Sequence, residues 1–137
     1  MDIQKTLEFS YSDKVNLLAI RGSIYRQLGY ITQAIADYEE VLRIRQKINA
    51  SEYSIGEALS ELGFAYLRQG KLLKGMRYCE EGVKLLRNCK TGGFLVRGLR
   101  KLSLAYLLIG KFKRAYETWE ESKRKALEYG AFDQIKI

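Results

Sequence analysis

A pattern of small and aromatic residues recurs three times along the 137-residue chain and limits the folds that the chain can adopt. The three copies align without gaps, and each aligned position steps by 41 and then by 40 residues. Five positions keep their character in every copy: Gly22, Gly63 and Ser103; Tyr25, Tyr66 and Tyr106; Gly29, Gly70 and Gly110; Ala34, Gly75 and Ala115; and Tyr38, Cys79 and Trp119. Internal repeats of this length predict an array of similar structural units.

The glycine position predicts a chain reversal in each copy. Gly29, Gly70 and Gly110 each lie between two stretches in which apolar residues recur at helical spacing. Glycine tolerates positive φ, so it can end one helix and turn the chain into the next. The small residues on either side would let two antiparallel helices approach closely. Stacked hairpins would then bury the faces that one hairpin leaves exposed, so the sequence predicts an all-α solenoid.

These residues resemble the tetratricopeptide repeat (TPR), over about residues 13 to 129 of the chain. The second copy is the most similar, with the characteristic residues Leu59, Leu62, Gly63, Tyr66 and Gly70. The departures from the family pattern are the absence of the closing proline and the residues Arg21, Gly75, Cys79 and Gly82. The period exceeds the usual 34 residues and is similar to that of longer-helix variants such as kinesin light chains. The resemblance implies a right-handed α-solenoid of about three antiparallel hairpins.

The repeats predict six helices and a single domain over residues 1–137. We expect helices over about 13–28, 32–48, 51–69, 72–88, 93–109 and 112–129, which form repeats at about 13–50, 54–90 and 93–130. Ser51 and Ser54 are candidate N-caps, and Gly130 is the expected stop of the last helix. Residues 1–12 would form an N-terminal cap or partial helix, and residues 131–137 a tail or the start of a truncated fourth repeat.

The resemblance also implies a binding groove lined by the first helix of each repeat. Residues of that helix recurring at three and four positions fall on one stripe. The predicted partner-binding residues are Phe64, Leu67, Arg68, Arg97, Arg100, Lys101, Leu104, Leu107 and Leu108. For the three leucines of the third copy, an equal alternative is an ordinary core contact to a neighbouring helix.

One TPR subclass binds acidic C-termini of chaperones through five residues called a carboxylate clamp. In this chain the first three clamp positions carry Ala19, Ser23 and Glu61, and only Arg97 and Lys101 have the required charge. Because Glu61 would repel a carboxylate, the sequence argues against a chaperone clamp.

Positive charge is concentrated in the second half of the chain. Residues 1–63 carry 7 basic and 9 acidic residues, whereas residues 64–137 carry 17 basic and 7 acidic residues. Such a field would steer an acidic partner to the C-terminal half. Nucleic-acid binding is a weaker alternative, because no groove-reading helix-turn-helix or aromatic stacking platform accompanies the charge.

The residue types give little support to catalysis. The chain has no histidine, which removes the commonest general base and the commonest metal ligand. Cys79 and Cys89 are too few for a zinc site and, on one helix, too far apart for a disulfide. The chain has neither a phosphate-binding glycine loop nor a long apolar run, and residues 1–5 start no signal-peptide core. We therefore expect no enzyme activity, cofactor, metal or membrane span, and a cytoplasmic location.

The sequence thus predicts a non-catalytic module that binds a peptide or helix with acidic and apolar residues. The alternative within binding is homo-oligomeric assembly, because repeat arrays with unsatisfied ends stack or swap. Apolar residues near both termini, including Ile3, Leu7 and Phe9, favour a covered end. Ser122 and Lys123 favour a last helix that faces water.

Overall fold

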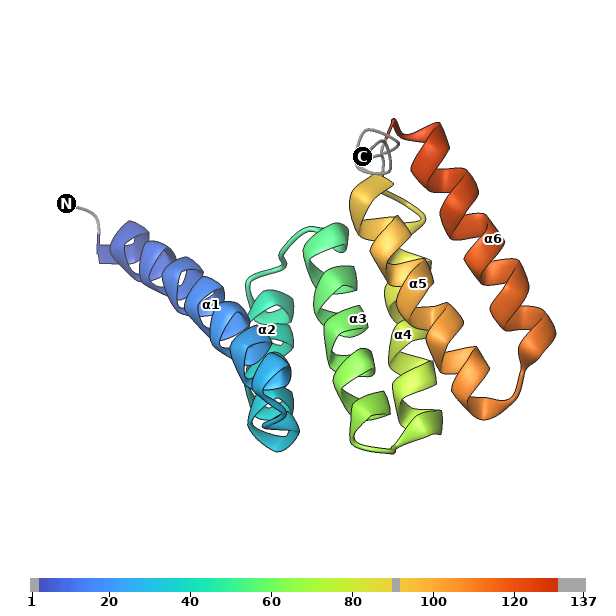
Figure 1. Cartoon of the computed structure of the whole chain (residues 1–137). Helices are drawn as coiled ribbons and strands as arrows, with labels where there is room; N and C mark the ends of the chain where they lie inside the picture. Colours follow the sequence, from blue (N-terminus) through green and yellow to red (C-terminus); the bar gives the residue numbers. More distant parts are fainter. Residues whose placement is uncertain (1–2, 90–91, 131–137) are drawn as a thin grey trace. The chain divides into compact units, whose positions relative to one another are not determined.

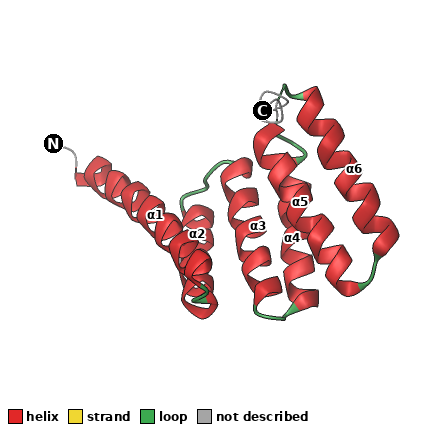
Figure 2. Cartoon of the chain, viewed as in Figure 1, coloured by secondary structure: helices red, strands yellow, loops and turns green. Residues whose placement is uncertain are grey.

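The described residues of the chain form six α-helices and no strand. The computed structural model describes the backbone of residues 3–89 and 92–130 and the side chains of residues 11–89 and 93–130. The helices are α1 (Ile3–Leu28), α2 (Ile31–Lys47), α3 (Glu52–Arg68), α4 (Leu72–Leu86), α5 (Gly92–Ile109) and α6 (Phe112–Glu128). They pair as the antiparallel hairpins α1–α2, α3–α4 and α5–α6, which confirms the predicted all-α solenoid of helical hairpins (Figures 1 and 2). Within these residues, no helix is long and apolar enough to cross a bilayer.

The repeated glycine turns the chain in all three hairpins, as predicted. Gly29, Gly70 and Gly110 have φ of 87°, 90° and 91°. In the second copy, the Lys71 amide after the glycine donates a 3.0 Å hydrogen bond to the Tyr66 carbonyl. The same bond occurs in the other two copies, at 2.8 Å each. This closure by a left-handed residue satisfies a carbonyl at the end of each first helix.

Most helix bounds agree with the sequence prediction to within two residues, and α1 is the exception. It begins at Ile3, so residues 3–12 continue the first helix instead of forming a separate cap. Ser51 takes the N-cap position of α3 without a capping bond, since its hydroxyl bonds the Ser54 hydroxyl at 3.0 Å. Ser122 is buried, contrary to prediction, and donates a 2.6 Å bond to the Trp119 carbonyl. The predictions for residues 131–137 and for the side chains of residues 3–9 lie outside the described residues.

The chain divides into two compact units, Met1–Ala50 and Ser51–Ile137. In the first unit, α1 packs on α2, and an added Cβ at Gly22 would lie 3.0 Å from the Tyr38 ring. The Arg21 guanidinium donates two hydrogen bonds, of 2.8 and 2.9 Å, to the buried Asp37 carboxylate. Arg21 stands where the family pattern has a leucine, and this bidentate pair accounts for the departure.

In the second unit, glycines let α3 and α4 approach until their backbones nearly touch. An added Cβ at Gly63 would lie 2.8 Å from the Gly75 carbonyl oxygen, and one at Gly82 would lie 2.9 Å from the Gly56 carbonyl oxygen. Gly56 and Gly63 are seven residues apart on α3, as are Gly75 and Gly82 on α4. Two turns of helix separate each pair, so both glycines of a helix lie on the same face.

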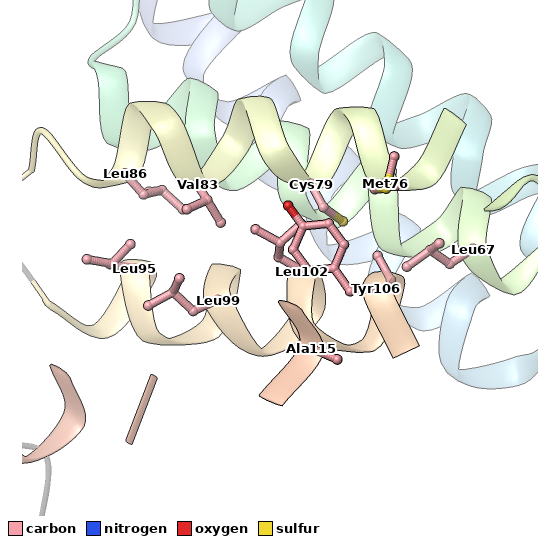
Figure 3. Packing of buried hydrophobic residues seen from close by; sticks show 11 residues of the cluster. Leu67, Met76, Cys79, Val83, Leu86, Leu95, Leu99, Leu102, Tyr106 and Ala115 are labelled. Carbon is pink, nitrogen blue, oxygen red and sulfur yellow. The ribbon is translucent and has the colours of Figure 1, made fainter. Parts of the chain in front are cut away.

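The core of this unit fills the space between α4 and α5. Leu67 from α3 and Ala115 from α6 also contribute to it (Figure 3). Its buried members are Leu67, Met76, Cys79, Val83, Leu86, Leu95, Leu99, Leu102, Ala105, Tyr106 and Ala115. Two hydrogen bonds link its edges to polar groups, because Tyr106 Oη donates to Glu80 at 2.8 Å and Ser103 Oγ donates to the Ala115 carbonyl at 2.8 Å. The repeated aromatic and small residues are therefore packing residues.

Candidate partner-binding surface

Two helices that are both first in their hairpins, α3 and α5, present a joint surface that we call the α3–α5 face. They contact one another within the second unit. On each helix, side chains that are exposed or half-buried recur every three or four residues, which places them on one side. The face consists of Tyr53, Glu57, Glu61, Phe64 and Arg68 from α3 and Phe94, Arg97, Lys101, Leu104 and Leu108 from α5.

An aromatic and cationic cluster forms the end of this face where both helices begin. The rings of Tyr53 and Phe94 lie 5.4 Å apart, and the Arg97 guanidinium lies 4.7 Å from the centre of the Phe94 ring. Stacking on the ring restricts the motion of the Arg97 side chain while its charge stays at the surface. Arg97 is therefore positioned to meet an anionic group.

An ion pair occupies the middle of the face. Lys101 Nζ on α5 pairs with Glu61 Oε1 on α3. The two side chains are only 18% and 22% exposed, so the pair is partly shielded from water. Lys101 was predicted to attract a partner with its charge. In the structure, that charge pairs with Glu61 and joins α3 to α5.

Apolar residues form the other end of the face, where both helices end. Phe64 and Leu104 are half-buried, and Leu108 is exposed. Arg68 is exposed at the end of α3. Arg100, which follows Arg97 by one helical turn, is also exposed, at the edge of the face. The structure thus brings five of the predicted residues onto this face: Phe64, Arg68, Arg97, Leu104 and Leu108.

Two of the predicted contacts do not belong to this face. Leu67 is 4% exposed and lies in the core between α4 and α5, where it contacts the backbone at Gly75. It cannot touch a partner, so its assignment was wrong. Leu107 occupies the equivalent position in the next repeat, and its 50% exposure reflects the place of α6 as the last described helix. The predicted stripe lay about one residue away from the observed face, toward the side of the helix that packs against the second helix of its hairpin.

Sequence reasoning missed Tyr53 and Phe94. Both lie within the first two turns of their helices, and both continue the stripe at helical spacing: Phe94 is three residues before Arg97, and Tyr53 is eight residues before Glu61. The spacing could have identified them, had the stripe been extended toward the helix starts.

The titratable groups around the core do not form a reactive site. Burial raises the pKa of the Cys79 thiol to about 12, so the thiol is protonated and unreactive at neutral pH. Burial, followed by the hydrogen bond to Glu80, raises the pKa of Tyr106. Across residues 11–89 and 93–130, no three histidine, cysteine, aspartate or glutamate side chains are grouped so that they could hold a metal ion.

Comparison with known proteins identifies the repeat. Residues 15–48 match the family model described as Tetratricopeptide repeat, and no curated protein matches the sequence. The structure is similar to the TPR domain of Arabidopsis FLU, with a TM-score of 0.76 at 13% identity over 86% of this chain and 98% of that one.

A second similar structure also consists of TPR-like repeats. The TPR-like repeats of a putative kinesin light chain from Podospora anserina have a TM-score of 0.73 at 22% identity, over 82% of this chain and 55% of that one. A variant of the same protein has a TM-score of 0.72. The present chain therefore spans about half of that structure. Residues 15–48 thus match one tetratricopeptide repeat, and the described helices have the fold of tetratricopeptide-repeat structures.

Proposed function

We propose that this chain is a non-catalytic interaction module that binds a peptide or helix of a partner protein on the α3–α5 face. TPR proteins generally act through protein–protein interaction. The observation that carries the proposal is the chemistry of this face, where a stacked guanidinium and apolar side chains that are at least partly exposed lie on the same two helices.

The two ends of the face favour different groups of a partner. Arg97 and Arg100 near the start of α5 suit carboxylates, since guanidinium groups bind carboxylates in a bidentate fashion. Phe64, Leu104 and Leu108 suit an apolar anchor, because desolvated apolar contacts usually dominate the affinity of an interface. The favoured partner segment therefore has acidic residues on one side of one or two apolar residues.

The charge of the surrounding residues supports an acidic partner. Residues 64–137 have a net charge of +10, and both α5 and Arg68 belong to this half. An acidic segment would therefore be attracted before it makes contact, which raises the association rate.

The test selects peptides from a random library on the wild-type chain and measures their affinity by fluorescence anisotropy. We expect acidic peptides with apolar anchors, and we expect Phe64→Ala and Leu104→Ala to weaken binding by about 1 to 2 kcal/mol each. Arg97→Glu should weaken binding of the same peptides. Arg77→Glu, the same charge change on an exposed residue of α4, serves as the matched control and should have little effect.

A different pattern would contradict the α3–α5 face as the binding site. If Arg77→Glu or changes on α2 and α6 abolish binding while Phe64→Ala and Arg97→Glu leave it intact, the partner binds the second helices of the hairpins. If no peptide or protein segment binds above background, the interaction module itself is wrong.

A further inference from the structure

The last described helix exposes a stripe of large apolar side chains. We call this stripe the α6 end surface and define it as Leu107 at the end of α5 with Phe112, Tyr116 and Trp119 of α6. All four are exposed. The three residues of α6 follow one another at four and three positions, so they lie on one side of the helix. Lys123, one turn further, lies over the Trp119 ring at 4.4 Å and extends the stripe with a cation.

The preceding repeat shows what such a stripe does when it is covered. Forty residues earlier, the equivalent positions are Leu67, Leu72, Met76 and Cys79. Met76 is 8% exposed where Tyr116 is 64% exposed, and Cys79 is fully buried where Trp119 is 46% exposed. The cover is α5, which packs on α4 within the same core (Figure 3). The α6 end surface is therefore equivalent to a surface that receives the first helix of the next repeat.

A helix with the complementary surface exists in this same chain. α1 exposes Leu17, Ile20, Ile24 and Leu28, a single stripe that we call the α1 end surface. Their equivalents in the third repeat, 81 residues later, are Gly98, Lys101, Ala105 and Ile109 of α5. Gly98 faces Leu86 of α4 and Ser60 of α3, and Lys101 pairs with Glu61 of α3. Ala105 is fully buried and Ile109 packs on the core, so this is the side of α5 that α3 and α4 cover.

We propose that the α6 end surface of one copy binds the α1 end surface of a second copy, in the way that α4 binds α5. The occupant is another copy of this chain, because the chain itself carries the matching helix at its other end. The contact is heterologous: each copy uses one surface to bind the copy before it and a different surface to bind the copy after it. Such contacts continue from copy to copy unless a ring closes.

The test measures the mass of the wild-type chain by sedimentation velocity over about a hundredfold range of concentration. We expect the average mass to rise steadily with concentration and to pass that of a dimer. One variant changes the α6 end surface, with Tyr116→Gln and Trp119→Gln. A second changes the α1 end surface, with Ile20→Gln and Ile24→Gln. Each should weaken self-association about tenfold or more.

The two variants together test the heterologous geometry. Each keeps one intact end surface, so their equimolar mixture should form a heterodimer and stop at that size. Leu73→Gln, which alters an equally exposed leucine of α4 outside both surfaces, should assemble like the wild type. Circular dichroism of each variant should show unchanged helix content, because every altered side chain is exposed.

Three results would overturn the proposal. The first is a wild-type chain that stays monomeric over the whole range. The second is a dimer that grows no further and survives the changes on α1, which would indicate an isologous contact between α6 helices. The third is a mixture of the two variants that remains monomeric. None of these results bears on peptide binding at the α3–α5 face.

Discussion

At the scale of single residues, glycines determine how closely the helices of the second hairpin pack. A Cβ added at Gly63 would lie 2.8 Å from the Gly75 carbonyl oxygen, and a Cβ added at Gly75 would lie 2.8 Å from the Gly63 carbonyl oxygen. At this distance, a methyl group can be accommodated only if the backbones move apart. Gly75 and Gly82 replace the alanines of the family pattern, so α3 and α4 are fitted to one another more tightly than the family pattern implies.

The substitution Gly63→Ala tests this close approach. Its methyl group would lie 2.8 Å from the Gly75 carbonyl oxygen and 2.9 Å from the Cys79 amide nitrogen, both of which are backbone atoms. We expect a loss of about 1 to 3 kcal/mol in the free energy of unfolding, measured by urea denaturation. Gly93→Ala is the matched control, because no atom lies within 4 Å of its added Cβ. An equal loss in both variants would show that packing is not the cause.

The two cysteines should differ sharply in reactivity. Cys79 is fully buried and burial raises its pKa to about 12, whereas Cys89 is half-buried at the end of the second hairpin. Since the thiolate is the reactive form, an alkylating reagent should modify Cys89 of the native protein and reach Cys79 only after denaturation. Mass spectrometry of the native and denatured protein measures this order. Equal labelling of both thiols in the native state would contradict the packing of α4.

At the scale of helices, the ion pair between Lys101 and Glu61 links α3 to α5. Lys101→Ala removes the positive charge beside the partly buried Glu61 carboxylate, so we expect a loss of about 1 to 2 kcal/mol in stability. The cycle of Lys101→Ala, Glu61→Ala and the double variant isolates the energy of the pair. If the two single losses simply add, the pair contributes nothing to the contact.

A second pair, between Arg87 at the end of α4 and Glu121 of α6, should make stability depend on pH. The hydrogen bond from Arg87 lowers the pKa of Glu121 below its ordinary value. A carboxyl group whose pKa is lowered by folding stabilises the folded state at pH values above its unfolded-state pKa. That stabilisation is lost as the pH falls through its folded-state pKa. The difference in melting temperature between the wild type and Arg87→Gln should therefore be present at neutral pH and shrink below about pH 4. Arg77→Gln is the control, and a difference that persists in acid would exclude the pair as its cause.

The helices were predictable from sequence because the information is repeated three times. The turn glycine occurs at the same place in all three copies, and apolar residues at helical spacing on both sides of it predicted the hairpins. The α3–α5 face was less predictable, because a rotation of one residue separates a core leucine such as Leu67 from a surface residue such as Arg68. Pairs between helices, such as Arg21 with Asp37, leave no periodic signal at all. A repeat pattern reveals only the features that all copies share. A contact that occurs in one copy alone cannot be read from it.

At the scale of the whole molecule, the net charge of +8 should separate the two proposed interactions by their response to salt. Binding of an acidic peptide to Arg97 and Arg100 is attractive at long range and should weaken as salt rises. Screening shortens the reach of charges to about 8 Å at physiological ionic strength. Self-association joins copies of like charge through apolar side chains, so added salt should strengthen it.

Measuring both interactions in one salt series tests these opposite slopes. Anisotropy with a selected acidic peptide should show affinity falling from low to moderate salt, and Arg97→Glu should flatten that slope because it removes an attractive charge. Phe64→Ala should lower the affinity by a similar factor at every salt concentration, since apolar contact is little affected by screening. Sedimentation over the same series should show the average mass rising. A self-association that weakens with salt would mean that charged residues hold the copies together, and the apolar end surfaces would then have no part in it.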